Sequence, residues 1–131
     1  MRYLLDTNIC VYFLKQHNKI VDKIASLSAD DFAISCFNLT ELLFGAYNSE
    51  YTDKNLERVR YIENTITVLP FDRNAIESYA IIKSSLKKQG KIIDDFDILI
   101  AAVALSHKLI LVTNNEKHFK RIPGLVIENW L

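Results

Sequence analysis

Short apolar runs alternate along the chain with longer segments in which apolar residues recur every three or four positions. The short runs are typical of buried strands and lie at residues 2–5, 32–37, 66–69, 109–113 and 126–127. The longer segments have helical spacing and lie from residue 9, where Asn8 is the expected cap, and at 19–27, 38–47, 52–64, 74–89 and 95–106. This alternation predicts a three-layer α/β/α fold with a mostly parallel sheet of about five strands.

The length of the chain, 131 residues, suits one domain spanning residues 1–131. No apolar run reaches the roughly 18 residues that a membrane helix needs, so we expect no membrane association. The two cysteines, Cys10 and Cys36, do not form a CxxC motif. We expect both to be small core residues of a protein in a reducing, cytoplasmic compartment.

The formal net charge is zero, from 16 basic and 16 acidic side chains. This balance argues against a broadly basic surface that coats nucleic acid. Two stretches on either side of the predicted 95–106 helix are nevertheless locally basic, which suits contact with phosphate, although cations also favour solvated helix ends. The candidate phosphate contacts are Lys87, Lys88, Lys91, Lys117, Lys120 and Arg121.

Acidic residues stand at three places where a carboxylate is costly or well placed for chemistry. Asp6 closes the first predicted strand, and ligands of parallel sheets bind beyond the carboxyl ends of strands. Glu41 has Phe37 and Phe44 on its own helix face, so its carboxylate should be partly buried and need a cation, a metal or a proton. Asp97 lies in the first turn of a helix that is apolar nearly all round.

Each of these acids also has an ordinary structural explanation. Asp6 and Asp97 could be helix caps, although Asp94 or Asp95 could already cap the 95–106 helix. Glu41 could pair with a Lys or Arg. Taken together, the acids predict a carboxylate cluster at one edge of the sheet. Hard oxygen ligands without Cys or His favour Mg²⁺ or Mn²⁺, and such sites typically hydrolyse phosphodiesters.

Several ordered motifs resemble those of the PIN-domain ribonucleases, and most closely the VapC toxins of toxin–antitoxin pairs. The matching segments cover nearly the whole chain, and they read YLLDTNICVYFLK, SCFNLTELLFGA and IIDDFDILIAAVALSHKLILVTNNEKHFKRIPGLVIENW. The resemblance implies that Asp6, Glu41 and Asp97 bind the metal and that Asn115 takes the place of a fourth acid. It also implies that Thr7 and Asn8 support Asp6 and that Thr113 supplies a hydroxyl near the metal, with ordinary packing as the alternative for Thr113.

The resemblance further implies a Mg²⁺- or Mn²⁺-dependent endoribonuclease that cuts tRNA or ribosomal RNA and leaves a 3′-hydroxyl and a 5′-phosphate. The implied partners are a VapB-type antitoxin and a second copy of the chain, giving a homodimer and a heterotetramer or larger assembly. Tyr12 and Phe13 are candidates for the antitoxin groove, or else ordinary core residues. The main alternative is a PIN-fold module that binds RNA or a partner with little catalysis. A haloacid-dehalogenase-like phosphatase is disfavoured, because it needs a second Asp where this chain has Asn8.

Overall fold

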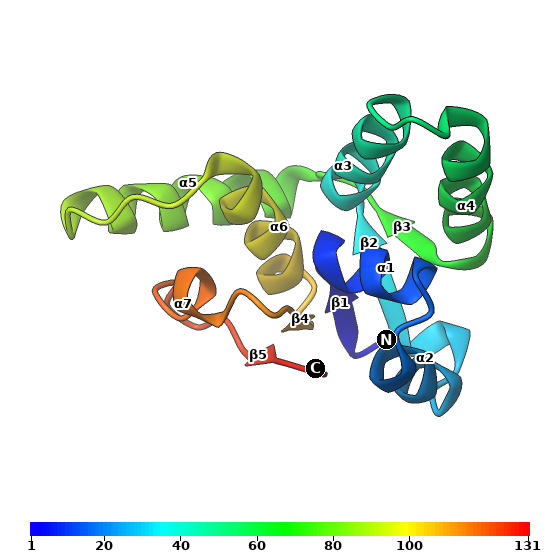
Figure 1. The fold of residues 1–131 in the computed structure, drawn as a ribbon. Coiled ribbons are helices and arrows are strands. Elements are labelled where there is room, and N and C mark those ends of the chain that lie inside the picture. The colour runs from blue at the N-terminus through cyan, green and yellow to red at the C-terminus, as the bar shows by residue number, and fades with distance from the viewer.

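The computed structural model, which describes residues 1–131, is built on a five-stranded sheet in the order β3-β2-β1-β4-β5 (Figure 1). Every neighbouring pair of strands is parallel, which confirms the predicted sheet. The strands are β1 (Tyr3–Leu5), β2 (Phe32–Ser35), β3 (Thr67–Leu69), β4 (Ile110–Val112) and β5 (Ile127–Glu128).

Helices cover both faces of the sheet, because alternate strand residues face opposite sides. Leu4 of β1 belongs to one apolar core, and its neighbours Tyr3 and Leu5 belong to the other. In Figure 1, α5, α6 and α7 lie on one side of the strands and α1, α2 and α4 on the other. The helices are α1 (Thr7–Leu14), α2 (Asn18–Ala25), α3 (Cys36–Tyr47), α4 (Thr52–Thr65), α5 (Arg73–Lys88), α6 (Asp95–Ser106) and α7 (Glu116–Phe119).

Side-chain caps set several of the element boundaries that the apolar pattern placed elsewhere. The N-cap of α1 is Asp6, which accepts a hydrogen bond from the backbone of Thr7, so the expectation of an Asn8 cap was wrong. Strand β2 ends at Ser35, two residues earlier than predicted, because Ser35 and Asn38 form a capping box that starts α3. Helix α5 ends at the C-cap Gln89, and Gly90 follows with φ at 68°.

Two short elements were not predicted, namely α7 and a 3₁₀ turn at Ala29–Asp31. Cys10 is buried as expected, whereas Cys36 is only half-buried, and neither forms a disulfide. None of the helices has both the length and the apolar character needed to cross a bilayer.

Candidate active site

The carboxyl ends of β1, β2 and β4 meet at one edge of the sheet, and the residues that follow them form the candidate site. Asp6 comes directly after β1, Thr113 directly after β4, and α3 carries Glu41 away from the end of β2. Asp97 reaches the same place from the first turn of α6. These acids lie close enough for their charges to interact, as Asp6 does with both Asp97 and Glu41. Acidic residues up to 91 positions apart in the chain therefore share one site.

Asp6 is the most buried of the three acids, with 6% of its surface exposed. Its Oδ1 accepts the backbone N–H of Thr7 at 2.8 Å, and its Oδ2 accepts the hydroxyl of Thr113 at 2.8 Å. Burial raises the pKa of Asp6, the Thr113 and Thr7 bonds oppose that rise, and the charge of Asp97 adds to it. Asp6 is thus a firmly held carboxyl group whose charge lacks a cationic partner.

Glu41 is half-buried on α3, as the aromatic residues around it predicted. Its Oε1 accepts the hydroxyl of Thr7 at 2.5 Å, and no Lys or Arg forms an ion pair with it. Burial raises the pKa of Glu41, the Thr7 bond lowers it, and the charges of Asp6 and Asp94 raise it further. The alternative in which a basic side chain neutralises Glu41 is therefore wrong.

Asp97 is half-buried and does not cap its helix, because Asp94 is the N-cap of α6. Its Oδ2 lies 3.4 Å from Nδ1 of His118, which stands on α7. Burial raises the pKa of Asp97, the bond to His118 lowers it, and the charge of Asp94 raises it. His118 was not among the predicted site residues. It lies three positions after Asn115, which was one of them.

The remaining predicted residues occupy different places around the acids. Thr113 is fully buried, accepts the backbone N–H of Asn115 at 2.9 Å and donates to Asp6. The side chain of Asn115 reaches His118, with Nδ2 at 2.9 Å from Nδ1. Asn8 is exposed on α1 and makes no side-chain hydrogen bond, whereas Asn38, which sequence reasoning missed, is fully buried beside Thr7.

Residues 3–125 match the PIN domain family. The chain belongs to this family. It is 36% identical over 131 residues to Ribonuclease VapC2 of Haemophilus influenzae, with 100% of this chain and 99% of that protein covered. It is 35% identical to the tRNA(fMet)-specific endonuclease VapC of Shigella flexneri, with 99% and 98% covered. The solved structure of VapBC2 from Rickettsia felis, bound to a DNA fragment from its promoter, matches with a TM-score of 0.92 at 35% identity and full coverage of both chains.

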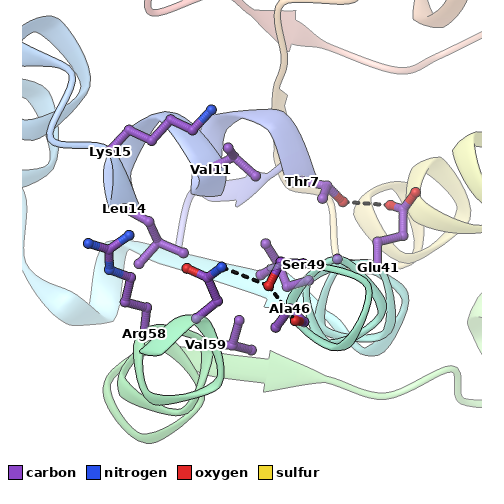
Figure 2. Close-up of a pocket in the computed structure, with 12 residues that line it drawn as sticks. Thr7, Val11, Leu14, Lys15, Glu41, Ala46, Ser49, Arg58 and Val59 are labelled. Carbon is purple, nitrogen blue, oxygen red and sulfur yellow. Dashed lines mark hydrogen bonds between the residues drawn. The ribbon is translucent and has the colours of Figure 1, made fainter. Parts of the chain in front are cut away.

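A groove of about 380 Å³ leads away from the acids of this PIN domain, between α1, α3 and α4 (Figure 2). Thr7 and Glu41 stand at one end of the groove, and Lys15 and Arg58 stand at the other. Apolar side chains line the space between these ends, among them Val11, Leu14, Leu42, Ala46 and Val59. The groove therefore has an acidic end, an apolar middle and a basic end.

The donor chemistry of the PIN-domain site suits a divalent cation. All three acids offer hard oxygen ligands, and the mutual repulsion of their charges would be relieved by a cation. No group of three or more His, Cys, Asp or Glu side chains could hold a metal ion as these side chains stand. The acids would have to move to bind one together, and the side chains of Glu41 and Asp97 are only half-buried.

The raised pKa values give a test of this electrostatic description. A carboxyl whose pKa is raised by folding stabilises the folded state at low pH, and that stability is lost as the pH rises through the folded pKa. In EDTA, we expect the melting temperature to fall as the pH rises from about 4, where unfolded carboxyls ionise, to neutral pH, and Mn²⁺ to restore it at neutral pH. Differential scanning calorimetry would measure both changes. An Asp97→Asn variant should show a smaller fall, and an equal fall would contradict this description.

Proposed function

We propose that this protein is a Mg²⁺- or Mn²⁺-dependent endoribonuclease of the VapC toxin type, acting in the cytoplasm and held in check by a VapB-type antitoxin. The observation that carries the proposal is the meeting of Asp6, Glu41 and Asp97 at one sheet edge, with no Lys or Arg neutralising any of them. The names of its full-length relatives support ribonuclease chemistry, and the Shigella relative points to a structured RNA such as tRNA.

In this proposal Asp6, Glu41 and Asp97 hold the cation, and Asn115 adds an amide oxygen nearby. A bound Mg²⁺ or Mn²⁺ lowers the pKa of a water molecule and offsets negative charge on the attacked phosphate. The surrounding residues keep the ligands in place: Thr113 and the backbone of Thr7 fix both oxygens of Asp6, and the Thr7 hydroxyl fixes one oxygen of Glu41.

The reaction is hydrolysis of an RNA phosphodiester. Water attacks phosphorus, the bond from phosphorus to the 3′-oxygen breaks, and the products carry a 3′-hydroxyl and a 5′-phosphate. Incubation of the purified protein with total RNA, followed by sequencing of 5′-phosphate ends, tests the proposal. We expect new ends at defined positions with Mn²⁺ or Mg²⁺ and none with EDTA. Cleavage that survives EDTA, or that leaves 5′-hydroxyl ends, would contradict it.

The six predicted phosphate-binding residues are all exposed, and they come from two segments that meet in space. The guanidinium of Arg121 donates to the backbone carbonyl of Ile92 at 3.5 Å, which joins the segment after α7 to the loop after α5. Lys83 is not included among these candidates, because its ammonium group forms an ion pair with Asp95. We infer that RNA phosphates lie along these two basic segments, the second of which also carries His118, the neighbour of Asp97.

Charge reversal on these basic segments should weaken RNA binding and leave the rate of the cleavage step nearly unchanged. For Lys88→Glu and Lys117→Glu, we expect KM to rise about tenfold each and kcat to change little, because phosphate contacts position the substrate. The salt dependence of kcat/KM should also become shallower. Steady-state kinetics at several salt concentrations would measure both effects. Lys19→Glu, an exposed change of the same charge on α2, is the control, and an equal rise in KM for it would contradict a localised RNA surface.

The groove beside Glu41 is the proposed docking site of the antitoxin. Its apolar middle suits the apolar face of a helix or an extended segment, and its acidic end suits a basic side chain of that segment. Lys15 and Arg58 at the other end call for an acidic residue. Phe13 lines a neighbouring hollow with Leu14 and Arg58, whereas Tyr12 packs edge-on against His17. A basic side chain placed against Glu41 would occupy the space that a cation needs.

A further inference from the structure

A buried chain of hydrogen bonds connects the start of α3 to Glu41. The backbone N–H of Ser35 donates to Oδ1 of Asn38 at 2.8 Å, and the Ser35 hydroxyl donates to the same oxygen at 2.7 Å. Nδ2 of Asn38 then donates to Oγ1 of Thr7 at 3.1 Å, and Oγ1 of Thr7 donates to Oε1 of Glu41 at 2.5 Å. Ser35 and Asn38 are both fully buried.

The direction of this chain is fixed from its buried end. A backbone N–H can only donate, so the atom of Asn38 that faces Ser35 has to be the amide oxygen. The amide nitrogen of Asn38 therefore faces Thr7, and it too can only donate. Since the Thr7 hydroxyl accepts this bond and has a single hydrogen, that hydrogen is directed to Glu41. No rotation of the hydroxyl or flip of the amide gives an equally satisfied alternative.

We propose that Asn38 is a positioning residue, which acts through the Thr7 hydroxyl to hold Oε1 of Glu41 as a hydrogen-bond acceptor and leave Oε2 available to a divalent cation. The inference rests on the proposed metal-dependent function. Because Asn38 is buried and its side chain hydrogen-bonds to Ser35 and Thr7 rather than to any of the three acids, it is not a catalytic residue.

The two ends of the Asn38 amide serve different purposes, so positioning of Glu41 can be distinguished from capping of α3. Capping of α3 uses only the oxygen of the Asn38 side chain, which accepts from Ser35. An aspartate at this position would have nearly the same shape and would cap the helix equally well. It would lack the N–H that Thr7 accepts, so the Thr7 hydrogen would be shared between two carboxylates.

The test compares Asn38→Asp, Thr7→Val and the double variant for Mn²⁺ binding, measured by electron paramagnetic resonance of free Mn²⁺. We expect Asn38→Asp to weaken Mn²⁺ binding at least about tenfold, as loss of supporting groups around metal ligands typically does. Its added negative charge would by itself tighten binding, so weakening has to come from the lost donor. In the Thr7→Val background, Asn38→Asp should cause no further weakening. Thr7→Ser should bind Mn²⁺ like the original protein.

The outcomes distinguish this inference from the proposed function. If the unaltered protein binds no Mn²⁺ and cleaves no RNA, the proposed function fails. If it does both and Asn38→Asp binds Mn²⁺ equally well, or weakens binding also in the Thr7→Val background, the positioning role is overturned. Asn64→Asp, an exposed change of the same charge on α4, controls for charge alone.

A measurement on the unaltered protein covers the case in which Asn38→Asp does not fold. Solvent exchange of the Asn38 side-chain amide hydrogens, followed by nuclear magnetic resonance, should be far slower than that of the exposed Asn64. Equal exchange rates would contradict the hydrogen bond to Thr7 and overturn the proposal.

Discussion

Replacing Asp6 by asparagine is expected to lower Mn²⁺-dependent RNA cleavage at least about a hundredfold, about 2.7 kcal/mol in transition-state free energy, and at the same time to raise the melting temperature. Activity should fall because the proposed metal site loses one of its three negatively charged oxygen donors. Stability should rise because the folded protein buries an ionised carboxylate whose charge has no cationic partner. Asparagine is as good an N-cap as aspartate, so α1 keeps its first hydrogen bond.

Two measurements on the same preparation, cleavage of end-labelled RNA and thermal unfolding in EDTA, would decide this prediction. We expect a gain of about 2–6 °C in the melting temperature together with the loss of activity. Asp22→Asn removes an exposed carboxylate on α2 and should change neither quantity. Undiminished cleavage by Asp6→Asn, in protein free of host nucleases, would exclude Asp6 as a metal ligand. Lower stability would show that loss of the hydrogen bond from Thr113, which an amide nitrogen cannot accept, outweighs relief of the buried charge.

The three acids could be predicted from the sequence because each stands where local rules make a carboxylate costly or useful. Asp6 ends an apolar strand, Glu41 has aromatic neighbours on its own helix face, and Asp97 is not needed as a cap once Asp94 is present. The parallel sheet was also predictable, since strands alternate with helices. It then follows from topology that Asp6 after β1, Glu41 on the helix after β2 and Asp97 at the start of α6 are brought together.

The contacts between side chains could not be predicted in this way. Thr7 contacts Glu41 across 34 residues and Asn38 contacts Thr7 across 31, so these contacts depend on how α1 and α3 are oriented. His118 lies on a helix of only four residues, which has too few positions for a helical pattern to be recognised. The Asn8 cap was wrong because Asp6 serves both as the cap of α1 and as a member of the acid cluster. Because Asp6 takes the capping role, the Asn8 side chain is left exposed and caps nothing.

A bulky side chain in the groove should separate the toxin from its antitoxin. Gly45 lies on α3 one turn after Glu41 and lines the groove, and a Cβ atom at this position would meet nothing within 4 Å beyond its chain neighbours and the backbone of its own helix. Gly45→Trp should therefore fold, since almost any residue is better than glycine inside a helix. The indole ring would fill space that we assign to the partner. We expect the dissociation constant for the antitoxin to rise at least about a hundredfold, about 2.7 kcal/mol, as expected when a well-packed interface is blocked.

Isothermal titration with the cognate VapB-type antitoxin would measure the effect, and Gly45→Ala is the matched control. The alanine methyl group enters open space, so its dissociation constant should stay within about twofold of the original, well under 1 kcal/mol. In cells, co-expressed antitoxin should relieve growth arrest caused by the alanine variant but not arrest caused by an active tryptophan variant. Equal affinity of both variants would place the antitoxin elsewhere on the surface. A loss confined to Gly45→Trp would tie inhibition to the groove that opens beside Glu41, because a partner in this groove blocks access to Glu41 from that side.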